Sequence, residues 1–300
     1  MTRAPSSRIS ARLWAVVIWT GSLLLGGSLQ AQPIVDAAWA KLPEGSHWDG
    51  STTWITPDGR GNVVVLVRKA PYFRVFTREG QPVRSFGDKG LFETAHSLSF
   101  DAEGNYWVSD STAHVVRKIS PDGRLLLTLG QPGVAGDNAA TDRFNQPNHV
   151  AFSPNGDVYV SDGYVNARIV QFTPDGKFVR IIGGVQGSAA GQLQVPHGVA
   201  LDSAGRILVN DSDNKRVSVF APDGGFVESW PVPSRGGITV LPDDTVYVSD
   251  VNEGIVNVLR DGKLLDSIRV DRAHGLGVDL NGDIYVSGAS RMTVYKVTRP

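Results

Sequence analysis

A unit of roughly 40 to 50 residues recurs along this chain, and the repetition constrains the fold more than any other feature. Each copy contains an apolar strand pattern, a turn, and a second strand pattern that usually ends in Ser-Asp or Asn-Asp. The copies are residues 51–68, 95–110, 148–162, 196–211, 236–250 and 273–288. This period is typical of four-stranded propeller blades. We therefore predict an all-β, six-bladed β-propeller with four antiparallel strands in each blade.

Turn residues between the strand patterns support this prediction. Asn155-Gly156 and Asn281-Gly282 supply the left-handed positions that tight hairpins need, and Pro-Asp-Gly turns precede three of the outer strands. A blade alone cannot bury its faces, so neighbouring blades must stack to form the core. The last copy lacks an outer strand of its own. We expect residues 34–42 to supply it and close the ring.

The N-terminal 31 residues have the three zones of a secretory signal peptide. Three arginines fall within the first 12 residues, an apolar stretch covers 13–29, and small or polar residues follow. We predict cleavage after Ala31, a single propeller domain over 32–300, and a secreted or periplasmic protein. An uncleaved membrane anchor is the alternative. After signal cleavage we expect no association with a membrane.

Charge and cysteine content narrow the possible partners. The 300-residue chain has a formal net charge of -1, so we expect no nucleic-acid partner. It has no Cys, which excludes disulfides and thiolate metal ligands. We expect a monomer that binds a small-molecule or peptide substrate.

Four of the six repeat copies begin the first strand with a histidine, at His96, His149, His197 and His274. In a propeller the first strand of each blade lines the central channel, so equivalent positions converge there. Three converging imidazoles suit Zn²⁺ or another divalent metal and leave a fourth position for water or substrate. The alternative is that each histidine only bonds backbone groups at the channel mouth.

Two further residues follow strand patterns and are candidates for catalysis. Tyr164 could act as a general base beside a metal that lowers its pKa, or it could be a packing tyrosine. Arg68 could bind a carboxylate in a bidentate manner, or it could be solvated. The strand-end aspartates recur too regularly to be catalytic. We expect them to accept hydrogen bonds from loop backbone N–H groups.

These motifs resemble the NHL-repeat propellers, and within them peptidyl-α-hydroxyglycine α-amidating lyase, the lyase domain of peptidylglycine α-amidating monooxygenase. The resemblance is strongest over residues 146–183, including Asp-Gly-Tyr-Val-Asn-Ala-Arg, and continues through Val-Pro-His at 195–197. It implies cleavage of a C-terminal α-hydroxyglycine to an amide and glyoxylate. The implied zinc ligands are His96, His197 and His274. Tyr164 matches the catalytic tyrosine, and Arg68 matches the arginine that engages the substrate's carboxylate end.

The chain departs from this family at several positions. The family's cysteines are missing, Ser212 replaces a second arginine, and His149 stands where an aspartate is usual. Gly275 replaces an acidic residue that helps to hold a structural calcium, which counts against a calcium site here. We hypothesise that Arg272 compensates for the lost arginine, because two residues before His274 on a strand its side chain should point to the same face.

Two other functions compete with the lyase. A lactonase-like metal hydrolase would hold its ion mainly with carboxylates and asparagines, whereas this channel is rich in histidine. A non-catalytic NHL propeller that binds a protein or glycan would need no metal.

Overall fold

The computed structural model describes residues 32–289 and 291–299. The predicted signal peptide, residues 1–31, lies outside the described residues. The described residues form strands and one three-residue 3₁₀ helix at Ser212–Asn214, so the fold belongs to the all-β class. No helix in the described part is long and apolar enough to cross a membrane.

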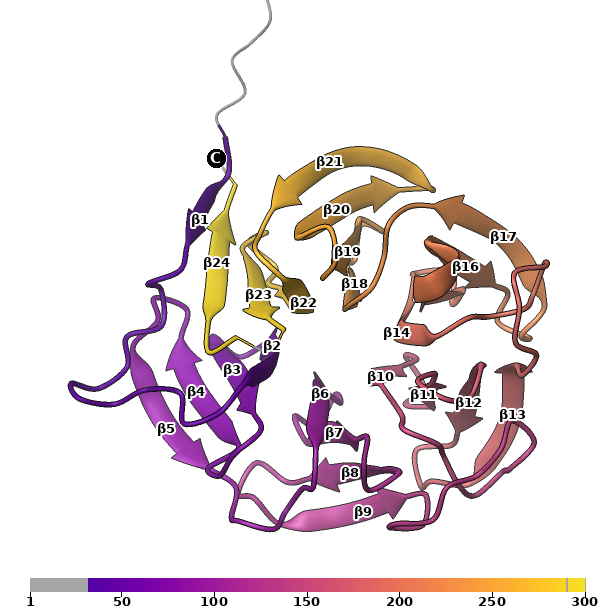
Figure 1. The fold of residues 1–300 in the computed structure, drawn as a ribbon, viewed down its shortest axis with the longest axis horizontal. Coiled ribbons are helices and arrows are strands. Elements are labelled where there is room, and N and C mark those ends of the chain that lie inside the picture. The colour runs from indigo at the N-terminus through magenta and orange to yellow at the C-terminus, as the bar shows by residue number, and fades with distance from the viewer. Residues whose placement is uncertain (1–31, 290, 300) are drawn as a thin grey trace, which may run out of the picture. The chain divides into compact units, whose positions relative to one another are not determined.

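Six four-stranded antiparallel sheets stand side by side in a ring, as Figure 1 shows, which confirms the predicted six-bladed propeller. Each sheet is one blade, with its first strand at the channel and its last at the rim. Blade 1 consists of β2 (Thr52–Pro57), β3 (Asn62–Val67), β4 (Phe73–Thr77) and β5 (Pro82–Phe86). Blade 2 consists of β6 (Ala95–Phe100), β7 (Tyr106–Asp110), β8 (Val115–Ile119) and β9 (Leu125–Leu129). Blade 3 consists of β10 (His149–Phe152), β11 (Val158–Asp162), β12 (Arg168–Phe172) and β13 (Phe178–Gly183).

The second half of the ring repeats this order. Blade 4 consists of β14 (Pro196–Leu201), β15 (Ile207–Asp211), β16 (Arg216–Phe220) and β17 (Phe226–Pro231). Blade 5 consists of β18 (Ile238–Val240), β19 (Val246–Asp250), β20 (Ile255–Arg260) and β21 (Lys263–Arg269). Blade 6 consists of β22 (Ala273–Val278), β23 (Ile284–Gly288), β24 (Val294–Thr298) and β1 (Ile34–Asp36).

The ring closes in blade 6, where β1 pairs antiparallel with β24 from the other end of the chain. This confirms the expectation that an N-terminal segment supplies the missing outer strand. Three residues after β1, the indole of Trp39 is buried against Phe76 of blade 1 and Tyr285 of blade 6. The N-terminal segment therefore contributes both a strand and a core residue at the closure.

The hydrophobic core lies between the blades. Six clusters of buried apolar side chains occupy the described residues, one at each interface between neighbouring blades. In the first of them, Leu66 and Phe73 of blade 1 pack with Leu98 and Val108 of blade 2. Because each blade shares both faces with its neighbours, the core exists only when the ring is assembled.

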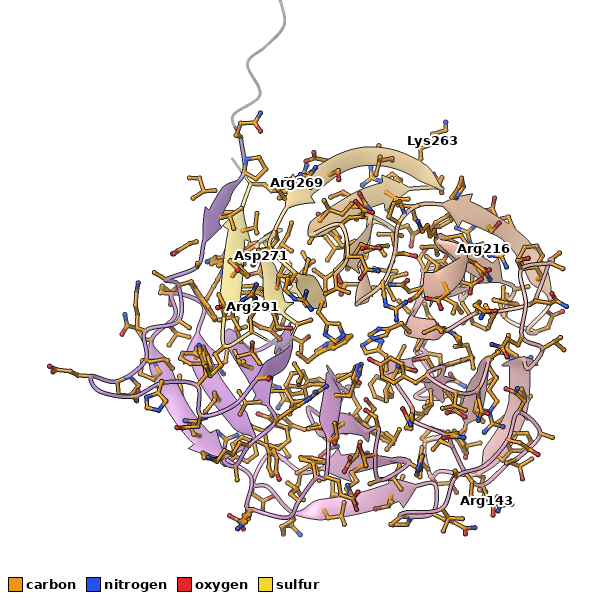
Figure 2. All side chains as sticks on the ribbon, in the orientation of Figure 1. Arg143, Arg216, Lys263, Arg269, Asp271 and Arg291 are labelled. Atoms are coloured by element: carbon orange, nitrogen blue, oxygen red, sulfur yellow. The ribbon has the colours of Figure 1, made fainter. Side chains whose placement is uncertain are left out.

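The strand-end aspartates hold the loops on the histidine side of the ring, as predicted. Asp110 accepts backbone N–H bonds from Glu93 and Thr94 at 2.9 and 2.8 Å. Asp162 likewise accepts the N–H of Asn145 at 2.8 Å and forms a fully buried ion pair with Arg168. In blade 4 Arg216, labelled in Figure 2, pairs with Asp211 in the same way.

Candidate metal and substrate site

Three histidines from alternate blades converge at the channel. His96, His197 and His274 are the second residues of β6, β14 and β22, and all three side chains are buried. Their ring centroids are 5.0 to 5.2 Å apart, and one nitrogen from each lies within 4.8 Å of the other two. The structure thus brings together the three residues that the family resemblance indicated, in an arrangement that could hold a metal ion.

Backbone carbonyls orient each of these rings. The Nδ1 atoms of His96, His197 and His274 lie 2.8, 2.9 and 3.0 Å from the carbonyl oxygens of Asn148, Gly236 and Thr53. A carbonyl can only accept, so each Nδ1 carries the proton and each Nε2 keeps its lone pair. Such a bond on the outer nitrogen is the usual support of a metal-binding histidine.

The environment keeps the three imidazoles neutral, which is the form that binds a metal. Burial lowers the pKa of His274 to about 4, and the charges of Arg68, Arg235 and Arg272 act in the same direction. Burial also holds the pKa of His96 and of His197 well below the usual value, reinforced by repulsion between the histidines. The donor set therefore fits Zn²⁺ or another divalent ion that accepts nitrogen ligands.

Tyr164 reaches this cluster from the loop after β11. Its hydroxyl lies 2.8 Å from Nε2 of His96 and 3.3 Å from Nε2 of His197. Burial raises the pKa of the phenol, whereas the positive charges of Arg68 and Arg235 lower it. The hydroxyl is thus placed where it meets both the imidazoles and whatever occupies the space between them.

A close backbone approach positions Tyr164. The preceding residue, Gly163, donates its N–H to the side-chain oxygen of Asn148 at 2.9 Å. A Cβ at Gly163 would come within 1.9 Å of the carbonyl oxygen of Pro196 in the next blade. Only glycine allows the loop to lie so close to β14, and this contact directs the tyrosine toward the channel.

A pocket of about 250 Å³ opens beside the histidines, and arginines supply its charge. Its lining includes Tyr164, His197 and His274 together with Arg68, Arg235 and Arg272. Arg68 follows β3, as predicted. Arg272 also lines the pocket, but the reason given from the sequence is wrong: it precedes β22 and has a left-handed backbone with φ 50°, so alternation along a strand does not apply.

His149 does not join the cluster, which corrects the expectation that four histidines share one register. The N–H of His149 bonds to Ser161 Oγ as that of Ser97 bonds to Ser109 Oγ. His149 is therefore equivalent to Ser97, one residue beyond His96. Its ring stacks on Trp54 at 4.7 Å. A one-residue offset turns a strand side chain to the other side, so His149 is a channel residue but not a candidate ligand.

Asn148 holds the matching position in blade 3. Its carbonyl accepts hydrogen bonds from His96 Nδ1 and Ser109 Oγ. The backbone is left-handed two residues earlier, at Gln146, as it is two residues before His197 and His274. The three blades therefore share this local backbone, and His149 stands apart because the sequence places it one residue later than the ligand position.

Sequence reasoning missed Arg235. It lies between β17 and β18, outside the strand starts and strand ends from which candidates were drawn. Its guanidinium forms an ion pair with Asp213 and lines the pocket. Its carbonyl accepts the N–H of Val251, as the carbonyl of Arg272 accepts that of Ala289, so the two arginines hold the same place in blades 5 and 6. The repeat alignment that singled out Arg272 could therefore have found Arg235.

The fold and the repeats define the class: the chain is a six-bladed propeller, and the family model "NHL repeat" matches residues 144–172 and 193–220. Among curated proteins it is similar to peptidylglycine alpha-amidating monooxygenase of Rattus norvegicus, with 34% identity over 235 residues, 70% of this chain and 24% of that protein. It is also similar to the probable peptidyl-alpha-hydroxyglycine alpha-amidating lyase pgal-1 of Caenorhabditis elegans, with 33% identity over 150 residues, 49% of this chain and 42% of that protein.

These matches confirm the resemblance to amidating-lyase propellers with NHL repeats. The chain spans about a quarter of the length of the monooxygenases it matches. A solved structure titled "Streptogramin B lyase structure" superposes with a TM-score of 0.62 at 13% identity, covering 89% of this chain and 98% of that one. At this identity the likeness concerns the fold alone.

Proposed function

We propose that the chain is a metal-dependent lyase that cleaves peptidyl-α-hydroxyglycine, or a similar α-hydroxy amide, to an amide and glyoxylate. The contact of the Tyr164 hydroxyl with His96 Nε2, at 2.8 Å in a pocket also lined by Arg68, carries the proposal. Relatives named as amidating lyases support an enzyme of this kind. Three neutral, inward-facing imidazoles support metal dependence.

The chain's own groups match the needs of this reaction. A divalent ion such as Zn²⁺, held by His96, His197 and His274, would supply a Lewis acid for the substrate's oxygen. Arg68 binds the substrate carboxylate and fixes its orientation. In its ionised form, which a bound cation and the charges of Arg68 and Arg235 would favour, Tyr164 takes the proton of the α-hydroxyl while the C–O bond becomes a carbonyl and the C–N bond breaks. The same proton then goes to the departing nitrogen, which leaves as the amide.

Glyoxylate release from α-hydroxyhippurate tests the proposal. We expect the zinc-loaded wild type to release glyoxylate and benzamide in equal amounts. Tyr164→Phe removes the proton acceptor and should lower kcat by about 10²-fold or more, in the range usual for a general base. Tyr295→Phe is the matched control, since its phenol lies on β24 in the outer part of blade 6. Equal rates for wild type and Tyr164→Phe would refute the role of Tyr164.

Metal content is measured on the same preparations. After chelator treatment and reloading with Zn²⁺, we expect one tightly bound ion in the wild type and loss of that ion in His197→Ala. His47→Ala should keep it, because His47 is exposed and lies outside the cluster. Glyoxylate release that continues after removal of all metal would show that the reaction does not depend on it.

A further inference from the structure

We propose that the substrate carries a second anionic group, on the amide side of the scissile bond, and that Arg272 binds it. This inference rests on the proposed function for the first anionic group, the carboxylate of the α-hydroxyglycine. It concerns which α-hydroxy amides the pocket selects.

The pocket offers more positive groups than one carboxylate can engage, and both Arg68 and Arg272 are exposed to incoming ligands. Three guanidinium groups line it, from Arg68, Arg235 and Arg272, and its lining contains no Asp or Glu among the described residues. Asp213 pairs with Arg235. Neither Arg68 nor Arg272 has a carboxylate partner in the described part of the chain. After Arg68 takes the α-carboxylate, one unpaired arginine remains.

Hydrogen bonds to the backbone of Ala289 fix the position of Arg272. Its Nε donates to the carbonyl of Ala289 at 2.9 Å, and its own carbonyl accepts the N–H of Ala289 at 3.0 Å. This reciprocal pair uses only Nε of the guanidinium and leaves the two terminal nitrogens for a ligand.

The rest of the lining fits a small acidic molecule. Thr52, Thr53 and Asn252 add neutral hydrogen-bonding groups, and Val251 and Ala289 add a little apolar surface. At about 250 Å³ the pocket lies at the small end of ligand sites. The charged lining favours an acyl group that ends in a carboxylate over an apolar one.

Unreactive analogues test this inference apart from turnover. N-succinylglycine carries both carboxylates and N-butyrylglycine only the first, and neither has the α-hydroxyl needed for cleavage. By calorimetry on the zinc-loaded protein, we expect wild type to bind the succinyl analogue about 10- to 100-fold more tightly, as a charge-assisted hydrogen-bonded pair allows. Arg272→Gln should bring this ratio close to one.

Arg269→Gln is the matched control. Arg269 ends β21 at the rim of the same ring, away from the channel in Figure 2, and is absent from the pocket lining. This variant loses the same charge and should keep the wild-type ratio. A wild-type ratio near one, or a preference that survives in Arg272→Gln, would overturn the inference.

The glyoxylate assay separates this result from the proposed function. Preference for the succinyl analogue without glyoxylate release from N-succinyl-α-hydroxyglycine would leave a dicarboxylate-binding pocket and reject the lyase. Glyoxylate release without any preference would keep the lyase and reject a second anion site.

Discussion

At the scale of single residues, register decides which side chains can share an ion. His149 and His96 occupy similar places in the sequence repeat, yet the first stacks on Trp54 and the second faces Tyr164. The ring position held by Trp54 and His149 is filled by Gly198 and Gly275 in blades 4 and 6. A Cβ on Gly275 would lie 2.6 Å from the Trp54 backbone. The glycine therefore leaves room for the Trp54 and His149 rings, which lie next to the three converging imidazoles in the channel.

The buried His149 predicts a pH dependence of stability. Burial lowers the pKa of His149 from 6.5 to about 4. Between these values the unfolded chain binds a proton that the folded chain refuses, so the free energy of unfolding falls as the pH drops from 6.5 to 4. The contribution is about 3 kcal/mol. Urea denaturation of the metal-free protein should show a smaller loss over this range for His149→Gln than for wild type.

His47 provides the control for this measurement, because it is exposed. His47→Gln should follow the wild-type pH profile, and the three converging histidines are present in all the proteins compared. If His149→Gln and wild type lose the same stability between pH 6.5 and 4, the buried imidazole is not the cause.

At the scale of elements, the loop that follows each second strand carries the variable chemistry of the blade. In blade 3 this loop presents Tyr164, and in blade 1 it presents Arg68, whereas the matching place in blade 4 holds Ser212 in a short 3₁₀ helix. The strands are similar because they must stack, and the loops differ because they face the pocket. Tyr164 and Arg68 therefore lie on loops that a rigid scaffold supports, whereas the three converging histidines lie on the first strands.

The approach of the Tyr164 loop to β14 makes Gly163 a sensitive position. Gly163→Ala would force a Cβ against backbone atoms of Pro196 that cannot move aside. We expect a loss of about 1–3 kcal/mol in stability, as overpacking usually costs, and a displaced Tyr164. Both are measured, by denaturation and by glyoxylate release.

Gly225→Ala is the comparison for this variant. A Cβ there meets only a carboxylate oxygen of Asp223, at 3.2 Å. This oxygen accepts the N–H of Gly225 and belongs to an exposed side chain that can shift by a few tenths of an ångström. The variant should leave both stability and turnover near wild type. A Gly163→Ala protein with wild-type turnover would show that the loop does not depend on this approach.

At the scale of the whole molecule, ring closure joins the two ends of the described chain and keeps the three histidine-bearing blades in place. β1 and Trp39 both contribute to the closure, and we expect them to differ in how much they stabilise it. β1 is a three-residue, exposed strand, whereas Trp39 is buried between blades 1 and 6 and donates its indole N–H to the Arg78 carbonyl at 2.8 Å. We infer that Trp39 contributes more to closure than the strand does.

Substitutions in Trp39 and in β1 test which of the two contributes more to the stability of the closed ring. Trp39→Ala removes a large buried side chain and should cost about 3–5 kcal/mol. Val35→Pro removes at most one ladder hydrogen bond of β1 and should cost about 1 kcal/mol. Denaturant unfolding of both variants measures the two losses, and a larger effect from Val35→Pro would reverse the assignment.

The sequence by itself determined the repeat, the blade count, the closing segment and the residue types at the site, because strand periodicity and turn chemistry are local properties. It also identified His96, His197, His274, Tyr164 and Arg68 through the resemblance carried by their motifs. Only the tertiary structure decided that His149 stands apart and that Arg235 joins the pocket. Both depend on contacts between blades, and these form only when the ring closes and brings distant segments together.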